Sequence, residues 1–87
     1  MRFLHTPVHA GPSEVLVVRF NMPTAKKAML LDEQNWQRYQ RGLPFGVHAG
    51  GFTAAMVTHL KPRCEADWHL VVDGRDDLAA TFEIRRH

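Results

Sequence analysis

The chain lacks the sequence features that stabilise small proteins through disulfide bonds or anchor proteins in a membrane. It has one cysteine, Cys64, in 87 residues, so no disulfide can form within it and the fold must depend on its core. The longest apolar run, Val15-Leu16-Val17-Val18, is far shorter than the roughly 18–20 residues that cross a bilayer. No leader-like apolar stretch follows Arg2. These absences predict a cytoplasmic protein with no membrane contact.

The residue types and patterns that carry common chemistry are also scarce. Ser13 is the only serine, so the nucleophile motif Gly-x-Ser-x-Gly is absent. The net charge is only +2 and the basic residues are scattered, whereas nucleic-acid-binding domains usually concentrate them in one patch. We therefore expect no catalytic residues and no cofactor. Nucleic-acid binding by a weakly basic surface stays an alternative.

Strand periodicity dominates what is present. Apolar and polar residues alternate in several short segments separated by Gly, Pro and Asp, which is typical of β-sandwiches and barrels. We expect about six strands, over residues 3–5, 14–20, 25–31, 53–60, 68–73 and 78–85. The second should be buried on both faces and should form a hairpin with the third. The polar residues 73–77 should join the last two strands as a hairpin loop.

One segment carries helix signals instead. Asp32 can cap a helix through its side chain, and Gly42 followed by Pro44 can end it. An apolar stripe recurs at helical spacing: Trp36, Tyr39 and Leu43. The prediction is a short helix over 32–41, packed on an end or a face of the sheet. The whole chain, residues 1–87, then reads as one mostly β domain, a small antiparallel, jelly-roll-like β-sandwich with this helix inserted.

Six histidines are many for a chain of this length. His59 and His69 could lie side by side on one face if their strands pair, and Asp73 follows in the strand of His69. A small metal-binding protein or enzyme using His59, His69 and Asp73 is thus a second alternative. Histidines from separate strands can form a zinc site, but no close-spaced pair indicates one. We expect no metal and interpret these histidines as exposed or hydrogen-bonded strand residues.

Two further groups are candidate binding residues. Gly50 and Gly51 could present backbone N–H groups to an anion, or could form a tight bend that folds Phe52 inward. Trp36 and Tyr39, with Trp68, could form an aromatic platform, although core packing explains all three.

Several segments, in order and spacing, resemble an uncharacterised bacterial family, domain-of-unknown-function family 1883. The resemblance covers nearly the whole chain and rests on these residues: Phe3-Leu4-His5, Leu30-Leu31-Asp32 with Asn35, Tyr39 and Gly42, Gly50-Gly51 with Thr53 and Val57, and Trp68-His69-Leu70-Val71-Val72-Asp73. It implies a compact β-sandwich of bacterial cytoplasm and supplies no established activity. Related domains beside Toll/interleukin-receptor-like domains suggest sensing or protein interaction. This chain departs from the family pattern at Ala49, where an aromatic is commoner, and in the turn after Asp73.

The function that fits these observations is a small non-enzymatic binding module. Its expected target is a protein partner or a second copy of the chain, because an exposed strand edge invites pairing with another strand.

Overall fold

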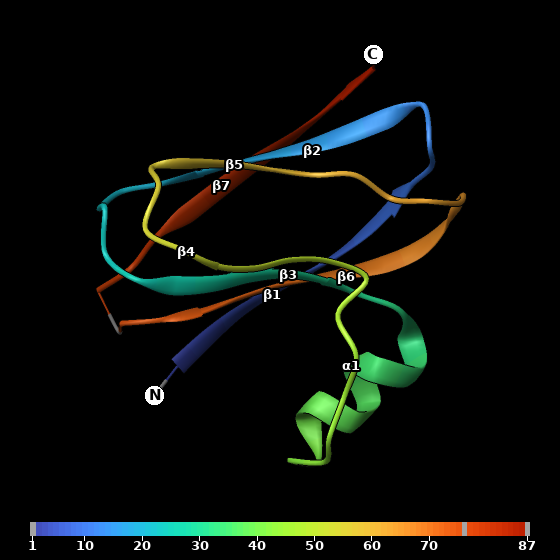
Figure 1. Cartoon of the computed structure of the whole chain (residues 1–87), viewed down its shortest axis with the longest axis horizontal. Helices are drawn as coiled ribbons and strands as arrows, with labels where there is room; N and C mark the ends of the chain where they lie inside the picture. Colours follow the sequence, from blue (N-terminus) through green and yellow to red (C-terminus); the bar gives the residue numbers. More distant parts are fainter. Residues whose placement is uncertain (1, 76, 87) are drawn as a thin grey trace.

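The computed structural model describes residues 2–75 and 77–86, which contain seven strands and one helix (Figure 1). In chain order they are β1 (Arg2–Ala10), β2 (Glu14–Phe20), β3 (Lys26–Leu31), α1 (Glu33–Gln40), β4 (Ala49–Thr53), β5 (Val57–Leu60), β6 (Ala66–Gly74) and β7 (Ala80–Arg86). The mostly β fold with one short helix after the third strand is confirmed. No helix in the described part of the chain has the length and apolar character needed to cross a membrane.

The predicted number of strands is one too few. The single strand expected over 53–60 is two strands, because the chain turns at residues 54–56 between β4 and β5. The glycines at positions 50 and 51 predict a loop, since glycine is depleted in strands, yet they lie inside β4.

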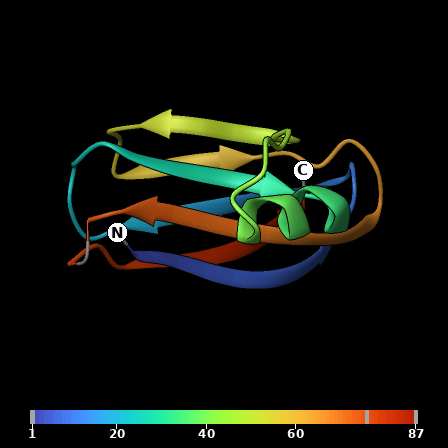
Figure 2. The ribbon, with the colours of Figure 1, turned by 90° about the horizontal axis from the view of Figure 1, so that it is seen from below.

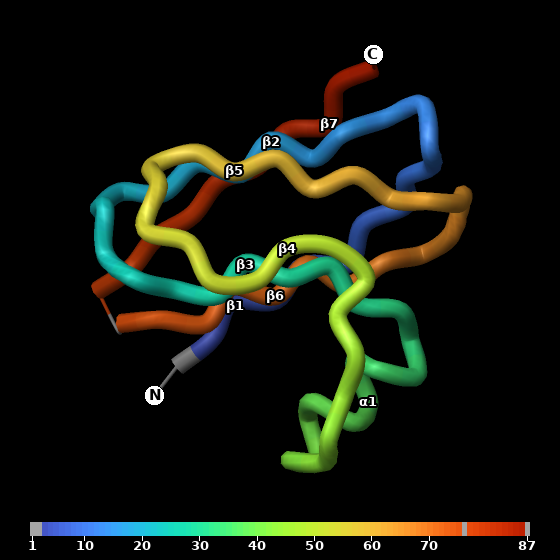
Figure 3. Tube along the Cα trace, in the orientation of Figure 1, coloured from blue at the N-terminus to red at the C-terminus, as the bar shows by residue number. Residues whose placement is uncertain are grey.

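The strands form two antiparallel sheets packed face to face, as the predicted sandwich requires (Figure 3). Sheet A has the order β1-β6-β3-β4, and sheet B has the order β5-β2-β7. Figure 2 shows β4 and β5 along one margin of the molecule and β1 and β7 along the opposite one.

Both predicted hairpins are wrong. Strands β2 and β3 lie in different sheets, and so do β6 and β7. A linker of five residues, such as 21–25, spans up to roughly 17 Å when extended, which exceeds the roughly 10 Å between packed sheets. A short linker can therefore pass from one sheet to the other as readily as it can form a hairpin within one sheet. Asp76, in the second predicted hairpin loop, lies outside the described residues.

The core lies between the sheets. Leu16, Val18 and Phe20 of β2 face Leu30 and Leu70 and their neighbours in sheet A, and all are buried. Full burial of such side chains stabilises the fold by roughly 1.5–3 kcal/mol each. Trp68 belongs to this core and donates from Nε1 to the Ala10 carbonyl oxygen at 3.1 Å, so it forms no exposed platform. Val15 and Val17, on the outer face of β2, are also buried, which confirms the prediction that this strand is covered on both faces.

One charged side chain lies inside this core. Lys26 at the start of β3 is only 2% exposed. Its Nζ donates to the carbonyl oxygens of Met22 and Ala55, at 3.0 and 2.7 Å, and lies 4.3 Å from the centroid of the Phe20 ring. A buried ammonium is tolerated when its donors are paired. Lys26 thereby ties the β2–β3 connection to the β4–β5 connection.

Helix α1 covers part of the outer face of sheet A. Asp32 accepts a hydrogen bond from the Asn35 backbone N–H at 2.8 Å, which confirms the predicted cap. Gly42 takes a φ of 69° just after the helix, as a terminating glycine does. Trp36 and Tyr39 pack against sheet A, but Leu43 is 48% exposed. The predicted stripe fails there because the helix ends at Gln40.

Candidate interaction site

An aromatic and imidazole cluster lies where helix α1 meets strands β1 and β6. Trp36 stacks on the His5 ring, with centroids 3.8 Å apart and planes 11° apart, and its ring centroid is 5.3 Å from that of His69. Trp36 is only 8% exposed. Its position therefore gives it a packing role, and it offers little surface to a ligand.

The two imidazoles continue as a hydrogen-bonded chain that ends on the helix. His5 Nε2 lies 2.8 Å from His69 Nδ1, and His69 Nε2 lies 2.8 Å from Glu33 Oε1. The carboxylate of Glu33 can only accept, so a neutral His69 donates from Nε2 and accepts at Nδ1, and His5 then donates from its own Nε2. Burial lowers the pKa of His5 and favours its neutral ring. These hydrogen bonds fasten α1 to both β1 and β6.

A second polar contact joins the other end of the helix to the sheet. Tyr39 donates from its hydroxyl to Asp73 Oδ2 at 2.9 Å. Burial, with this hydrogen bond and the charge of Asp73, raises the pKa of Tyr39 to about 12. The candidate binding residues Trp36, Tyr39, His69 and Asp73 thus come together on one face of sheet A. Their contacts fasten the helix.

The structure does not bring His59 to this cluster. His59 in β5 pairs with Val17 in β2, on the outer face of sheet B, whereas His69 and Asp73 lie on the outer face of sheet A with the helix. Strands β5 and β6 lie in different sheets, so both sheets and the core separate His59 from His69 and Asp73. Within residues 2–75 and 77–86, no group of three or more His, Cys, Asp or Glu is placed to hold a metal ion.

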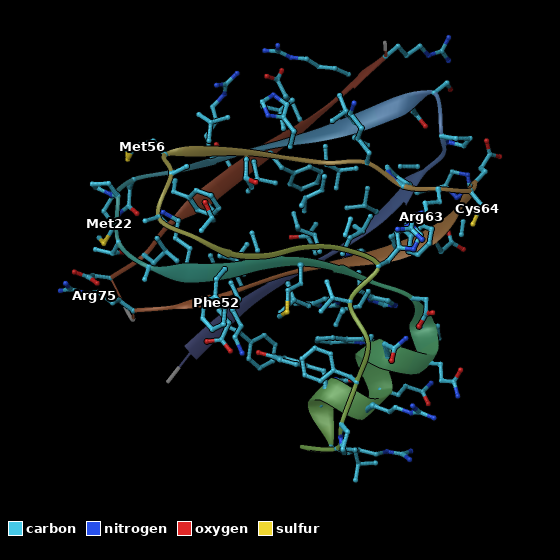
Figure 4. The ribbon with its side chains drawn as sticks, viewed as in Figure 1. Met22, Phe52, Met56, Arg63, Cys64 and Arg75 are labelled. Carbon is cyan, nitrogen blue, oxygen red and sulfur yellow. The ribbon has the colours of Figure 1, made fainter. Side chains whose placement is uncertain are left out.

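The two candidate glycines lie where β4 approaches β3. A Cβ built on Gly50, whose φ is 96°, would lie 2.0 Å from the Ala28 carbonyl oxygen and 2.8 Å from Leu60 Cδ2. Glycine at position 50 is therefore required by close packing. Phe52 does not fold inward as predicted: it is 79% exposed and points to the helix side of sheet A (Figure 4), with Lys27 Nζ 4.9 Å from its ring centroid.

Strand β7 presents an apolar face that is only partly covered. Phe82 lies opposite Val18 and Ile84 opposite Leu16, so both side chains point to the core side of sheet B. Yet Phe82 is 37% exposed and Ile84 is 41% exposed. A small cavity beside Phe82 is lined by residues of β1, β2, β6 and β7, among them Leu4 and Val72. Strand β7 thus has the alternating pattern of a strand with one buried face, but this face is partly exposed.

The unequal size of the sheets explains this exposure. Sheet A has four strands and sheet B has three. Strands β4 and β5 contact each other at one margin, so sheet B is one strand short at the other margin, beside β7 (Figure 2). In the part of the chain that the structure describes, no strand pairs with the outer edge of β7.

The sheets have four edges, and three of them carry features that hinder pairing. Strand β1 contains Pro7, which lacks a backbone donor. Strand β4 contains Gly50 and Gly51 at positive φ, and β5 has four residues and is soon followed by Pro62. Short strands, prolines and distorted backbone are the devices that protect sheet edges. Strand β7 has seven residues and contains neither proline nor glycine. Its charged residues, Glu83, Arg85 and Arg86, are of both signs, so a strand of complementary charge can still pair with it.

Comparisons with family models, with curated proteins and with solved structures give no match. The resemblance to domain-of-unknown-function family 1883 therefore stays a prediction.

The sequence interpretation missed the residues that set this edge apart. The alternation of apolar and polar residues over 78–85 is typical of a strand with one face covered and one exposed to water, yet Phe82 and Ile84 on the apolar face are partly exposed. Their exposure depends on how many strands each sheet receives, and strand patterns in one chain do not specify this. His5 and Glu33 were missed because their contacts with His69 join three separate elements.

Proposed function

We propose that this chain is a protein-interaction module that binds an extended segment of another chain by strand addition at β7. The observation that carries the proposal is the open outer edge of β7 combined with the 37% and 41% exposure of Phe82 and Ile84. In strand addition the backbone supplies affinity through main-chain hydrogen bonds, and alternate side chains supply specificity.

The residues of β7 specify the chemistry of the incoming strand. Its core-side residue beside Ile84 should be apolar, and its residue beside Phe82 should be apolar or an arginine, whose side chain can pack on an aromatic ring. On the outer face, Glu83 calls for a basic residue opposite it and Arg85 for an acidic one, since directly opposed charges contribute to pairing. The expected ligand is thus an extended segment of alternating pattern with one charge of each sign. Seven residues of β7 offer roughly 23 Å of edge.

The test uses synthetic peptides of this alternating pattern, labelled with a fluorophore and titrated with the whole protein while anisotropy is recorded. A peptide of the same composition in scrambled order is the first control. The second control is a pair of peptides with N-methyl groups on alternate residues. In one peptide the methyl groups remove the backbone N–H donors of one edge of the extended strand, and in the other they remove those of the opposite edge. Strand addition uses a single peptide edge, so one N-methylated version should bind and the other should not.

The proposal predicts saturable binding of the alternating peptide that is abolished by only one N-methylation pattern. Equal binding of the scrambled peptide would contradict it. So would the absence of binding by any alternating peptide, or binding of nucleic acid alone with a steep loss on adding salt, which would favour a basic surface as the site.

A further inference from the structure

We propose that the strand that docks on β7 is β7 of a second copy of this chain, antiparallel, with Ile84 opposite Ile84 of the second copy. This inference rests on strand addition at β7 as the function of the module. It adds the identity of the partner and the register of pairing.

The register follows from the twofold symmetry of such a dimer. Residues directly opposite each other share a face of the sheet, so the symmetry axis must pass through a pair of identical residues. An axis at Glu83 opposes two glutamates, and an axis at Arg85 opposes two arginines. An axis at Phe82 leaves the arginines beyond the paired segment. An axis at Ile84 places Glu83 opposite Arg85 of the second copy, and Arg85 opposite its Glu83.

The same register suits the apolar face. Two Ile84 side chains would meet at the axis on the core side, where each is now 41% exposed. Phe82 would lie opposite Arg86 of the second copy, on the face that it shares with Ile84, and an arginine beside an aromatic ring is a favourable pair. The 37% exposure of Phe82 would fall, and the paired strands would complete the margin where sheet B is one strand short.

The charges that would cross the interface are already held in place on the outer face. Glu83 Oε1 accepts from Arg19 Nη2 at 3.0 Å and from Arg85 Nη2 at 2.7 Å. A carboxylate can accept from several donors, so it can take a further donor from the second copy. Strand β7 is therefore charge-complementary to itself in one register.

The experiment measures self-association of the full chain by sedimentation equilibrium at several concentrations. The wild-type protein should form a dimer of about 20 kDa, twice the 10.0 kDa of one chain. The variants Glu83→Arg and Arg85→Glu each replace two attractive cross-strand pairs by two repulsive ones. Each should raise the dissociation constant at least about tenfold.

The decisive sample is an equal mixture of the two variants. One carries arginine at both positions and the other glutamate at both, so a mixed pair regains opposite charges at every outer-face contact. The mixture should form a heterodimer at concentrations where each variant alone is a monomer. The variant Arg38→Glu, a charge reversal at an exposed position of α1, is the matched control and should dimerise as the wild type does. Thermal unfolding of each variant establishes that it is folded.

Three results would overturn the inference: a wild-type monomer throughout, single variants that dimerise as the wild type does, or a mixture that stays monomeric. If the wild type is a monomer but alternating peptides still bind in the N-methyl assay, only the second-copy identity fails. If neither binds, the proposed function fails with it.

Discussion

Glu83 and Arg85 lie two residues apart on the outer face of β7, and both Nε and Nη2 of Arg85 donate to the same oxygen, Glu83 Oε1, at 3.1 and 2.7 Å. Arg19 of β2 donates to that oxygen as well. The hydrogen bonds from Arg19 and then from Arg85 lower the pKa of Glu83, so its charge persists through the neutral range. The open strand thus displays fixed charges of both signs above an apolar face.

Replacement of Ile84 by threonine should separate binding from stability. Ile84 is 41% exposed in the free chain, so the loss of its apolar surface should lower the free energy of unfolding by less than about 1 kcal/mol. The affinity for alternating peptides should fall at least about fivefold, because the bound state would bury the full side chain. The control is Val57→Thr, at a strand residue of 37% exposure on the outer face of β5. Equal loss of affinity in both variants would argue against the β7 site.

Replacement of Lys26 by methionine should destabilise the fold strongly. The change keeps the length of the side chain but leaves the Met22 and Ala55 carbonyl oxygens without their donor. We expect a loss of about 2 to 4 kcal/mol, measured by urea unfolding. The neighbouring Lys27→Met, on the other face of β3, is the control and should change stability by less than about 1 kcal/mol. Similar results for the two variants would contradict the structural role of Lys26.

Stability should decrease as the pH falls below about 6.5. Burial, with the charge of Arg63, lowers the pKa of His48, and burial also lowers that of His5. The unfolded chain therefore binds protons at a higher pH than the folded chain does, so this stability is complete above the unfolded pKa and is lost as the pH falls through the folded pKa. A protonated His48 also cannot accept the Arg63 backbone N–H, now 2.9 Å from its Nε2.

Urea unfolding between pH 7.5 and 5 measures this effect, and His48→Gln should flatten the profile. His9 acts in the opposite sense, since its hydrogen bond with Asp67 raises its pKa, but its exposed position makes its contribution small. Stability that rises on acidification would contradict the half-buried, neutral state of His5 and His48.

The single tyrosine of the chain makes the Tyr39–Asp73 contact measurable without interference. Ultraviolet absorbance of the phenolate, followed against pH, should give a midpoint at about 12. Asp73→Asn should lower the midpoint toward the ordinary tyrosine value of about 10, because it removes the charge that opposes ionisation. Circular dichroism at each pH establishes that the fold persists. A wild-type midpoint at the ordinary value would contradict both the burial of Tyr39 and its contact with Asp73.

Alanine at Gly50 should be far more costly than alanine at Gly42. Both glycines have positive φ, which costs a residue with a side chain about 1–2 kcal/mol. A Cβ at position 42 meets nothing within 4 Å, whereas at position 50 it meets the Ala28 carbonyl oxygen at 2.0 Å. Thermal unfolding should show a modest loss for Gly42→Ala and a loss several times larger, or failure to fold, for Gly50→Ala. Equal effects would mean that β4 does not approach β3 as described.

Local features of the fold follow from the sequence because they depend on neighbours in the chain. The cap at Asp32, the end of the helix at Gly42 and the burial of both faces of β2 are of this kind. The pairing of strands does not follow, because a linker such as 21–25 can turn within one sheet or cross to the other. The same ambiguity separates His59 from His69, although both lie on strands with clear patterns.

The open edge of β7 belongs to this second kind. Phe82 and Ile84 read as buried residues from their alternation, and only the count of strands in each sheet shows that they are partly exposed. The contacts that join His5, His69 and Glu33 depend on the same long-range arrangement, since they link β1, β6 and α1. Features that depend on how the strands assemble into sheets therefore cannot be predicted from the sequence of one chain.

Hydrogen exchange of the backbone amides, recorded by NMR with and without an alternating peptide, tests strand addition at β7 most directly. A strand added at the free edge of β7 protects the backbone amides that point out of that edge. These amides belong to every second residue of β7. Added protection at alternate residues of 80–86, with little change elsewhere, is the predicted result. Protection centred instead on α1 and the outer face of sheet A, or none in β7 when the peptide is bound, would contradict the account.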